Sequence, residues 1–144
     1  GMDVARKTVI LARELGYETE ISDISVQSLV PEALRNVSKD EFMSRLTELD
    51  EPMAELFASA SEKGMVIRYV GKVEDGVCTV SLAEYPAEHA FAQAKGTDNV
   101  IAFSTARYNK EPLVIKGPGA GPEVTAGGVF ADILRLSAYL GSKI

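Results

Sequence analysis

The sequence predicts an α+β fold, in which a mostly antiparallel, mixed sheet is covered on one face by helices. Three observations support this prediction: a helical pattern opens the chain, a run of β segments occupies its second half, and another helical pattern follows them. Like elements that follow one another along a chain indicate segregated helices and strands rather than alternating βαβ units. We therefore expect one domain over residues 1–144.

The first helix is predicted over residues 3–15. Four residues share one of its faces at helical spacing: Val4, Thr8, Leu11 and Leu15. Gly16 follows as a typical C-terminal residue of a helix. Residues 20–30 then favour a β segment, which Pro31 closes.

A capping-box pattern at residues 38–41, Ser-Lys-Asp-Glu, predicts the start of the next helical region. Apolar residues then repeat at steps of three or four: Phe42, Leu46, Leu49, Met53, Leu56 and Ala60. Pro52 lacks an N–H and clashes with the preceding turn, so we expect either a kink or two abutting helices there.

Two strands are predicted at residues 65–73 and 78–84. Asp75-Gly76 between them is a strong hairpin signal, because tight primed turns require positive φ angles. Residues 99–107 and 112–116 predict two further strands. A closing helix is predicted over residues 124–140, with an expected buried side made of four residues: Val129, Ile133, Leu136 and Leu140. Gly127 and Gly128 are expected to let this helix pack tightly against a neighbouring element.

Composition excludes several classes of function. A formal net charge of −6 with scattered basic residues argues against nucleic acid as a partner. No apolar run approaches the roughly 20 residues that span a bilayer, so no membrane partner is expected. Cys78 is the single cysteine, which fits a reducing compartment, and with one histidine the sequence predicts no metal site. We expect Cys78 and His89 to be structural, and Asn99 to be a turn residue.

The first motif that could carry chemistry is Gly-Met-Asp-Val-Ala-Arg-Lys at residues 1–7. Asp3 and Lys7 are four residues apart and are therefore neighbours on a helix. The spacing alone favours an ordinary surface ion pair. The alternative is a carboxylate that binds an ammonium group beside an amine that transfers a proton.

The second motif is the glycine-rich stretch at residues 116–125. Gly119-x-Gly121 weakly resembles a dinucleotide fingerprint, but Val124 occupies the third glycine position. About twenty residues follow, too few for a βαβ unit. Two interpretations remain open: a strand-to-helix connection with unusual backbone angles, or a loop whose N–H groups approach a ligand closely.

Six segments in order along the chain resemble the homoserine dehydrogenase family: G-M-D-V-A-R-K, L-A-R-E-L-G, R-Y-V-G, E-D-G-V-C, N-V-I-A-F and G-A-G-P-E-V-T-A-G-G-V-F-A-D. The likeness covers essentially the whole chain and looks closest to the C-terminal end of bifunctional aspartokinase–homoserine dehydrogenases. The resemblance implies a cytoplasmic oxidoreductase that uses NADP or NAD. Its reaction would interconvert L-homoserine and L-aspartate 4-semialdehyde, for threonine and methionine biosynthesis.

The resemblance also implies roles for single residues. Lys7 matches the family's acid/base for the substrate oxygen, Asp3 matches an aspartate that helps to hold homoserine, and Gly121 matches a glycine at the cofactor. The family's upstream glutamate and its N-terminal nucleotide-binding domain are absent from these residues. We therefore expect a substrate and dimerisation domain, which forms a homodimer and is inactive alone.

Two alternatives stay open beside this hypothesis. The chain could be a non-catalytic dimerisation or small-molecule-binding module of the same fold, which the loss of Asp3 or Lys7 would have favoured. It could also belong to another dehydrogenase of similar architecture, such as an aspartate-semialdehyde dehydrogenase with a cysteine nucleophile. Cys78, in a predicted hairpin strand with no assigned base, argues against the latter.

Overall fold

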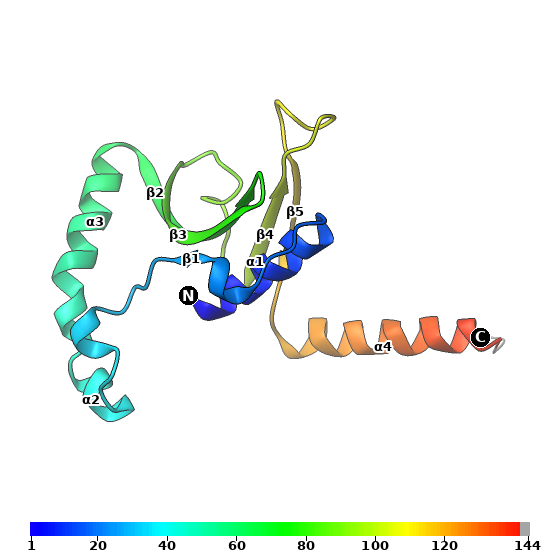
Figure 1. The fold of residues 1–144 in the computed structure, drawn as a ribbon, viewed down its shortest axis with the longest axis horizontal. Helices are drawn as coiled ribbons and strands as arrows, with labels where there is room; N and C mark the ends of the chain where they lie inside the picture. The colour runs from blue at the N-terminus through cyan, green and yellow to red at the C-terminus, as the bar shows by residue number, and fades with distance from the viewer. Residues whose placement is uncertain (142–144) are drawn as a thin grey trace. The chain divides into compact units, whose positions relative to one another are not determined.

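The chain forms two compact units, Gly1–Ala87 and Glu88–Ile144, in a computed structural model that describes residues 1–141 (Figure 1). Its helices and strands confirm the α+β class. The strands form two sheets rather than one continuous sheet. The first unit holds a three-stranded mixed sheet in the order β1-β3-β2, and the second holds the antiparallel pair β4-β5.

Helix α1 (Met2–Glu14) confirms the first predicted helix, and Gly16 follows it with a φ of +91°. The buried residues of this helix are Ala5, Thr8, Val9 and Ala12, and Val4 packs against the same core. The expected face was therefore right for Val4 and Thr8 and wrong at its C-terminal end. Leu15, which was assigned to the apolar face, is exposed. Small side chains let the helix approach strands β2 and β3 closely. The close packing that results favours this face over one made of larger apolar residues.

The β segment expected at residues 20–30 is mostly irregular, so that prediction was wrong in extent. A 3₁₀ turn, Ile21–Asp23, opens it, because the Asp23 carboxylate accepts a hydrogen bond from the Glu20 N–H at 2.9 Å. Strand β1 (Ser25–Val26) follows and runs parallel to β3. A second 3₁₀ turn, Glu32–Leu34, comes directly after Pro31.

The second helical region consists of abutting helices: α2 (Lys39–Ser44), a 3₁₀ turn (Leu46–Leu49) and α3 (Asp50–Glu62). This confirms one of the two arrangements expected around Pro52. The proline lies in the first turn of α3, where a missing N–H costs no intrahelical hydrogen bond.

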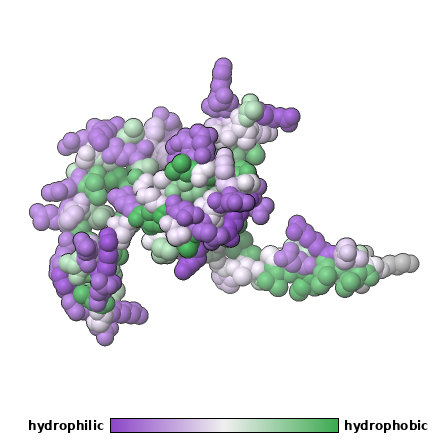
Figure 2. Space-filling model, viewed as in Figure 1, coloured by the Kyte–Doolittle hydropathy of each residue, from purple (hydrophilic) through white to green (hydrophobic). Residues whose placement is uncertain are grey.

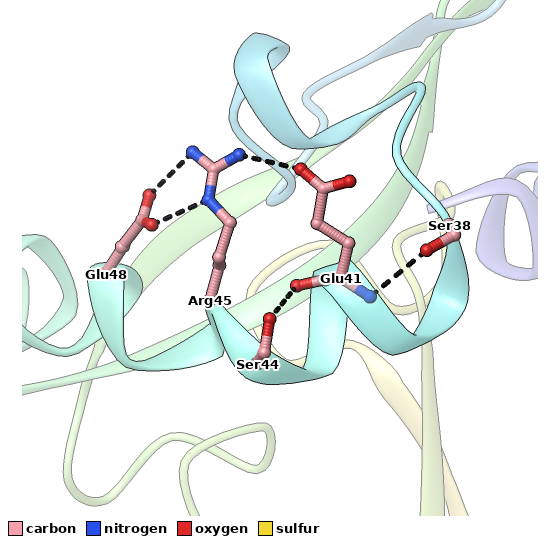
Figure 3. A network of polar contacts seen from close by, with 5 residues as sticks. All are labelled: Ser38, Glu41, Ser44, Arg45 and Glu48. Atoms are coloured by element: carbon pink, nitrogen blue, oxygen red, sulfur yellow. Dashed lines mark hydrogen bonds and ion pairs between the residues drawn. The ribbon is translucent and has the colours of Figure 1, made fainter.

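Polar contacts connect the start of α2 to the 3₁₀ turn that follows it (Figure 3). Ser38 Oγ accepts a hydrogen bond from the Glu41 N–H at 3.2 Å, which confirms the hydroxyl half of the predicted capping box. The Glu41 carboxylate pairs with Arg45, which also donates to Glu48 at 2.7 Å. Bonds to Glu48 and then to Glu41 raise the pKa of Arg45, and Arg45 lowers the pKa of Glu48.

Strands β2 (Met65–Glu74) and β3 (Val77–Pro86) form the predicted hairpin. Asp75 and Gly76 both have positive φ, of +50° and +81°, as a primed turn requires. Cys78 and Val80 of β3 pack with α1 and Ile24 in the core of this unit. The buried position of Cys78 confirms it as a core residue.

In the second unit, β4 (Asp98–Phe103) pairs antiparallel with β5 (Leu113–Pro118). Strand β4 is shorter than the expected residues 99–107, because the chain turns after it. The Tyr108 N–H donates to Thr105 Oγ1 at 3.1 Å, and the Thr105 N–H donates to the Tyr108 carbonyl.

Helix α4 (Pro122–Tyr139) confirms the closing helix, but its expected buried side is exposed. All four residues assigned to that side are more than half exposed: Val129, Ile133, Leu136 and Leu140. Figure 2 shows apolar side chains along one side of this helix. Apart from the chain neighbours and the backbone of the helix itself, no described atom lies within 4 Å of a Cβ built on Gly127 or Gly128. The tight packing expected of these glycines is therefore not found among residues 1–141.

Candidate active site

Asp3 and Lys7 lie together on the first turns of α1, as their spacing predicted. Lys7 Nζ is 3.0 Å from Asp3 Oδ2, and the two side chains are 62% and 76% exposed. The Asp3 carboxylate stands in the first helical turn, where the helix dipole favours a negative charge. The arrangement offers an amine and a carboxylate at one accessible place on the first unit.

The buried face of α1 holds this pair in place. Thr8 directly follows Lys7, and its hydroxyl donates to the Val4 carbonyl at 2.9 Å. The same hydroxyl lies against Gly71 of β2. Gly71 was not among the predicted site residues, although a glycine inside a strand is a recognised signal of close backbone approach.

Gly121 belongs to the second unit and caps the N-terminus of α4. Its φ of +133° is one that residues with a Cβ rarely adopt, and a Cβ built on it would lie 3.9 Å from Val124 Cγ1, an ordinary contact distance. Pro122 follows, and the N–H groups of Glu123 and Val124 stand in the first turn, where no helix carbonyl precedes them. Such a turn can bind an anionic group through its backbone, although the Glu123 carboxylate shares that position.

Asn99 is not the turn residue that the sequence predicted. It is the second residue of β4, and its side chain occupies the space that a Cβ on Gly119 would need. The Gly119 N–H also donates to the Thr97 carbonyl at 2.8 Å. Gly119 is therefore explained by a close contact with the neighbouring strand, and it holds the glycine loop against β4.

The turn before β4 is instead made by Asp98. Its carboxylate accepts a hydrogen bond from the Lys95 N–H at 3.0 Å and lies 3.1 Å from Lys116 Nζ. These two contacts, the backbone one first, lower the pKa of Asp98. The pair links both strands of the sheet next to the glycine loop.

His89 has the structural surroundings that the sequence predicted. Its Nδ1 accepts a hydrogen bond from the Phe91 N–H at 3.1 Å, and the two rings meet edge to face. Across residues 1–141, His, Cys, Asp and Glu side chains form no group of three that could hold a metal ion. No helix in this range combines the length and apolarity needed to cross a membrane.

Comparison with known proteins links both motifs to one family. The family model described as homoserine dehydrogenase matches residues 1–134, which include Asp3, Lys7 and Gly121. The bifunctional aspartokinase/homoserine dehydrogenase 1 of Zea mays, a chloroplastic protein, is 55% identical over 99% of this chain. The homoserine dehydrogenase of Paracoccidioides brasiliensis is 46% identical over 94% of it.

The chain spans only part of these relatives. It covers 16% of the length of the Zea mays protein and 38% of the Paracoccidioides brasiliensis protein. A crystal structure of a Candida auris protein of unknown function superposes with a TM-score of 0.86 at 42% identity. That superposition covers 96% of this chain and 39% of the Candida auris chain, so the fold described above recurs as a portion of a larger protein.

Proposed function

Because this chain belongs to the homoserine dehydrogenase family, we propose that it is the C-terminal catalytic part of an enzyme that interconverts L-homoserine and L-aspartate 4-semialdehyde. The reaction would serve threonine and methionine biosynthesis and use NADP or NAD. The observation that carries this proposal is the Lys7–Asp3 pair, with 3.0 Å between Nζ and Oδ2, inside the segment that matches the family.

Lys7 is the proposed proton carrier. Its neutral amine accepts the C4 hydroxyl proton of homoserine while hydride leaves C4, so the O–H and C–H bonds break and a carbonyl forms. In the reverse direction the ammonium form of Lys7 protonates the carbonyl oxygen. The nicotinamide cofactor, when bound, supplies the hydride acceptor or donor.

Asp3 is the proposed binding group for the substrate's ammonium. One of its oxygens already contacts Lys7, and the second oxygen can accept a charge-assisted hydrogen bond from the substrate. This arrangement places the substrate beside the amine that exchanges its proton. Asp3 therefore acts mainly in binding, and Lys7 mainly in the chemical step.

Gly121 is the proposed cofactor contact of this chain. Its position as the N-cap of α4 and the first-turn N–H groups of Glu123 and Val124 fit the approach of a dinucleotide phosphate. The glycine loop supplies one wall of such a site. The other walls are proposed to come from an N-terminal nucleotide-binding domain of the same protein.

The exposed side of α4 is the proposed docking surface for that N-terminal domain. Large apolar residues such as Phe130, Ile133 and Leu136 lie along a helix that begins at Gly121. A domain that supplies the rest of the cofactor site must lie close to Gly121, and this side offers it apolar area to bury. A homodimer and an aspartokinase module remain part of the proposal, the latter supported by the name of the Zea mays relative.

The cytoplasmic location is likewise a proposal. The relatives from Zea mays, Daucus carota and Arabidopsis thaliana carry "chloroplastic" in their names. Fractionation of the source cells, followed by immunodetection of this protein, tests the compartment directly.

One observation favours the alternative of a non-catalytic module. The exposure of Lys7 and Asp3 is also what an ordinary surface ion pair shows. A second exposed pair in the same unit, Lys72–Glu74, has an N–O distance of 2.7 Å and a lysine that is 61% exposed. It provides a matched control for the catalytic hypothesis.

The test compares Lys7→Ala, Asp3→Ala and Lys72→Ala in the full-length protein. Lys7→Ala should lower kcat by roughly 10²- to 10⁴-fold, the usual cost of removing a positioned general acid/base. Asp3→Ala should show much of its cost as a higher KM for homoserine, and Lys72→Ala should behave as wild type. Steady-state assays of NADPH or NADH formation measure all three. Near-normal turnover in Lys7→Ala would contradict the proposed role and favour the non-catalytic module.

A further inference from the structure

A glycine in the middle of β2 lies directly beneath α1. Gly71 pairs with Val80 of β3 and belongs to a strand of ten residues. Its φ is not positive, so its backbone conformation is open to any residue. A glycine inside a strand weakens it, since it adds backbone entropy and provides no side chain to pack. We therefore attribute the presence of a glycine at position 71 to its contact with another element.

That contact is made by the first turns of α1. A Cβ on Gly71 would overlap Thr8 Oγ1 and would come within 3.2 Å of Val4 Cγ1. The Thr8 hydroxyl is fixed, because it donates to the Val4 carbonyl at 2.9 Å within the helix. The turn between Val4 and Thr8 thus rests on the bare backbone of β2.

The same turn carries the proposed catalytic pair. Asp3 and Lys7 each come one residue before Val4 and Thr8. The two pairs are therefore offset by only about 1.5 Å along the helix and by about 100° around it. The depth at which Val4 and Thr8 settle on Gly71 consequently sets the place of the Lys7 amine relative to the sheet.

A second contact supports the start of the helix. The Tyr69 hydroxyl donates to the Gln27 carbonyl at 2.7 Å, and the Gln27 side chain accepts a hydrogen bond from the Leu82 N–H at 2.9 Å. A Cβ on Gly1, the N-cap of α1, would overlap this fixed hydroxyl. Tyr69 and Gly71 are two apart in β2 and so face the same side of the sheet.

We propose that Gly71 is a positioning residue for the reaction: because it lacks a side chain, α1 settles at the depth where Lys7 and Asp3 meet the substrate. This inference rests on the proposed function. A displacement near 1 Å can cost on the order of 100-fold in rate, because proton and hydride transfer need aligned atoms. The proposed cofactor contact at Gly121 lies in the other unit, so we expect it to be insensitive to this packing.

The experiment uses a size exchange between Gly71 and Thr8 in the full-length protein. Gly71→Ala should lower kcat by roughly 10- to 100-fold and raise the KM for homoserine, while the KM for the cofactor stays unchanged. Thr8→Ala removes the overlapping oxygen and leaves its own Cβ at 3.5 Å, an ordinary contact distance. The double variant Gly71→Ala/Thr8→Ala should therefore recover most of the lost turnover.

Two further variants separate the possible failures. Leu34→Ala removes a buried side chain outside the core cluster of α1, so it should lower stability and leave both KM values and kcat per folded molecule unchanged. Lys7→Ala reports on the proposed function itself. If Lys7→Ala is inactive and Gly71→Ala has wild-type kinetics, the positioning role is overturned and the proposed function stands.

The activity of the double variant Gly71→Ala/Thr8→Ala tests whether the overlap with Thr8 causes the loss. A double variant that is no more active than Gly71→Ala overturns the proposal, because the overlap with Thr8 would not be the cause. Should Gly71→Ala fail to fold by circular dichroism, the double variant carries the test alone. It must fold and turn over near the wild-type rate, and the proposal is overturned if it does not.

Discussion

The sequence predicts an apolar face on both α1 and α4. Among the described residues, only the face of α1 is buried. Ala5 and Ala12 of α1 are fully buried against the hairpin, whereas Phe130 and Ile133 of α4 are more than half exposed. The α1 face is made of small residues that fit closely on a strand with a glycine in it. The α4 side is made of large residues and has the proposed N-terminal domain as its expected partner. Under the proposed function, the proton-transfer part of the site would have its scaffold within this chain, and the cofactor part would depend on a second domain.

The strongest expected consequence concerns activity. This chain alone should fold and show no homoserine dehydrogenase activity. Hydride transfer requires the nicotinamide within about 3–3.5 Å of the reacting carbon, and the proposed N-terminal domain would be needed to hold it there. Titration with NADPH and NADH should give weak or undetectable binding, and the steady-state assay should read background. The full-length protein should restore both. Homoserine oxidation at an appreciable rate by these 144 residues would show that the site is not divided between two domains.

A matched pair of substitutions compares the two helices directly. Val9 of α1 is 7% exposed and Val129 of α4 is 59% exposed. In this chain alone, Val9→Ala should lower the free energy of unfolding by about 2 kcal/mol, from lost burial plus a cavity. Val129→Ala should change it by less than about 0.5 kcal/mol, since an exposed site loses little and alanine favours a helix. Urea denaturation followed by circular dichroism measures both values.

The same pair should behave differently in the full-length protein. If the N-terminal domain covers α4, Val129→Ala should there become clearly destabilising and approach the cost of Val9→Ala. Equal and small effects of Val129→Ala in both proteins would argue against docking on this side of the helix.

The smallest expected effect concerns acid stability of the second unit. The Lys95 N–H and then Lys116 hold the pKa of Asp98 below its usual range. A carboxyl with a lower pKa in the folded than in the unfolded state stabilises above the unfolded pKa, and this contribution is lost as pH falls through the folded pKa. Asp98→Asn should therefore lower the melting temperature at neutral pH, and the difference from wild type should vanish in strong acid. A difference that persists unchanged in acid would assign the effect to packing.

Predictions from the sequence succeeded where the signal and its effect lie close together in the chain. Asp75-Gly76 encodes its turn through two positive φ angles, and Ser38 caps a helix that begins at the next residue. The contact between Asp3 and Lys7 was predictable for the same reason, because it spans one helical turn.

Predictions failed where a distant partner decides the outcome. The buried face of α1 depends on Gly71, which is far along the chain, and hydrophobicity alone favoured a face that includes the exposed Leu15. Asn99 follows turn-forming residues, yet its contact with Gly119 across the sheet makes it a strand residue. The buried side expected for α4 was wrong for the described residues, because an apolar helical pattern does not specify which element covers it.

The short turn at Asp75-Gly76 also bears on the order of events in time. Strands β2 and β3 are each ten residues long and pair along their whole length, so their contacts join neighbours in the chain. A hairpin of this kind closes within about 1–10 μs, whereas a helix that docks from far along the chain must first close a long loop. We expect the hairpin to form first, so that the sheet surface around Gly71 is already folded before α1 packs on it. Lys7 would then reach its final position late in folding, when α1 packs on the hairpin.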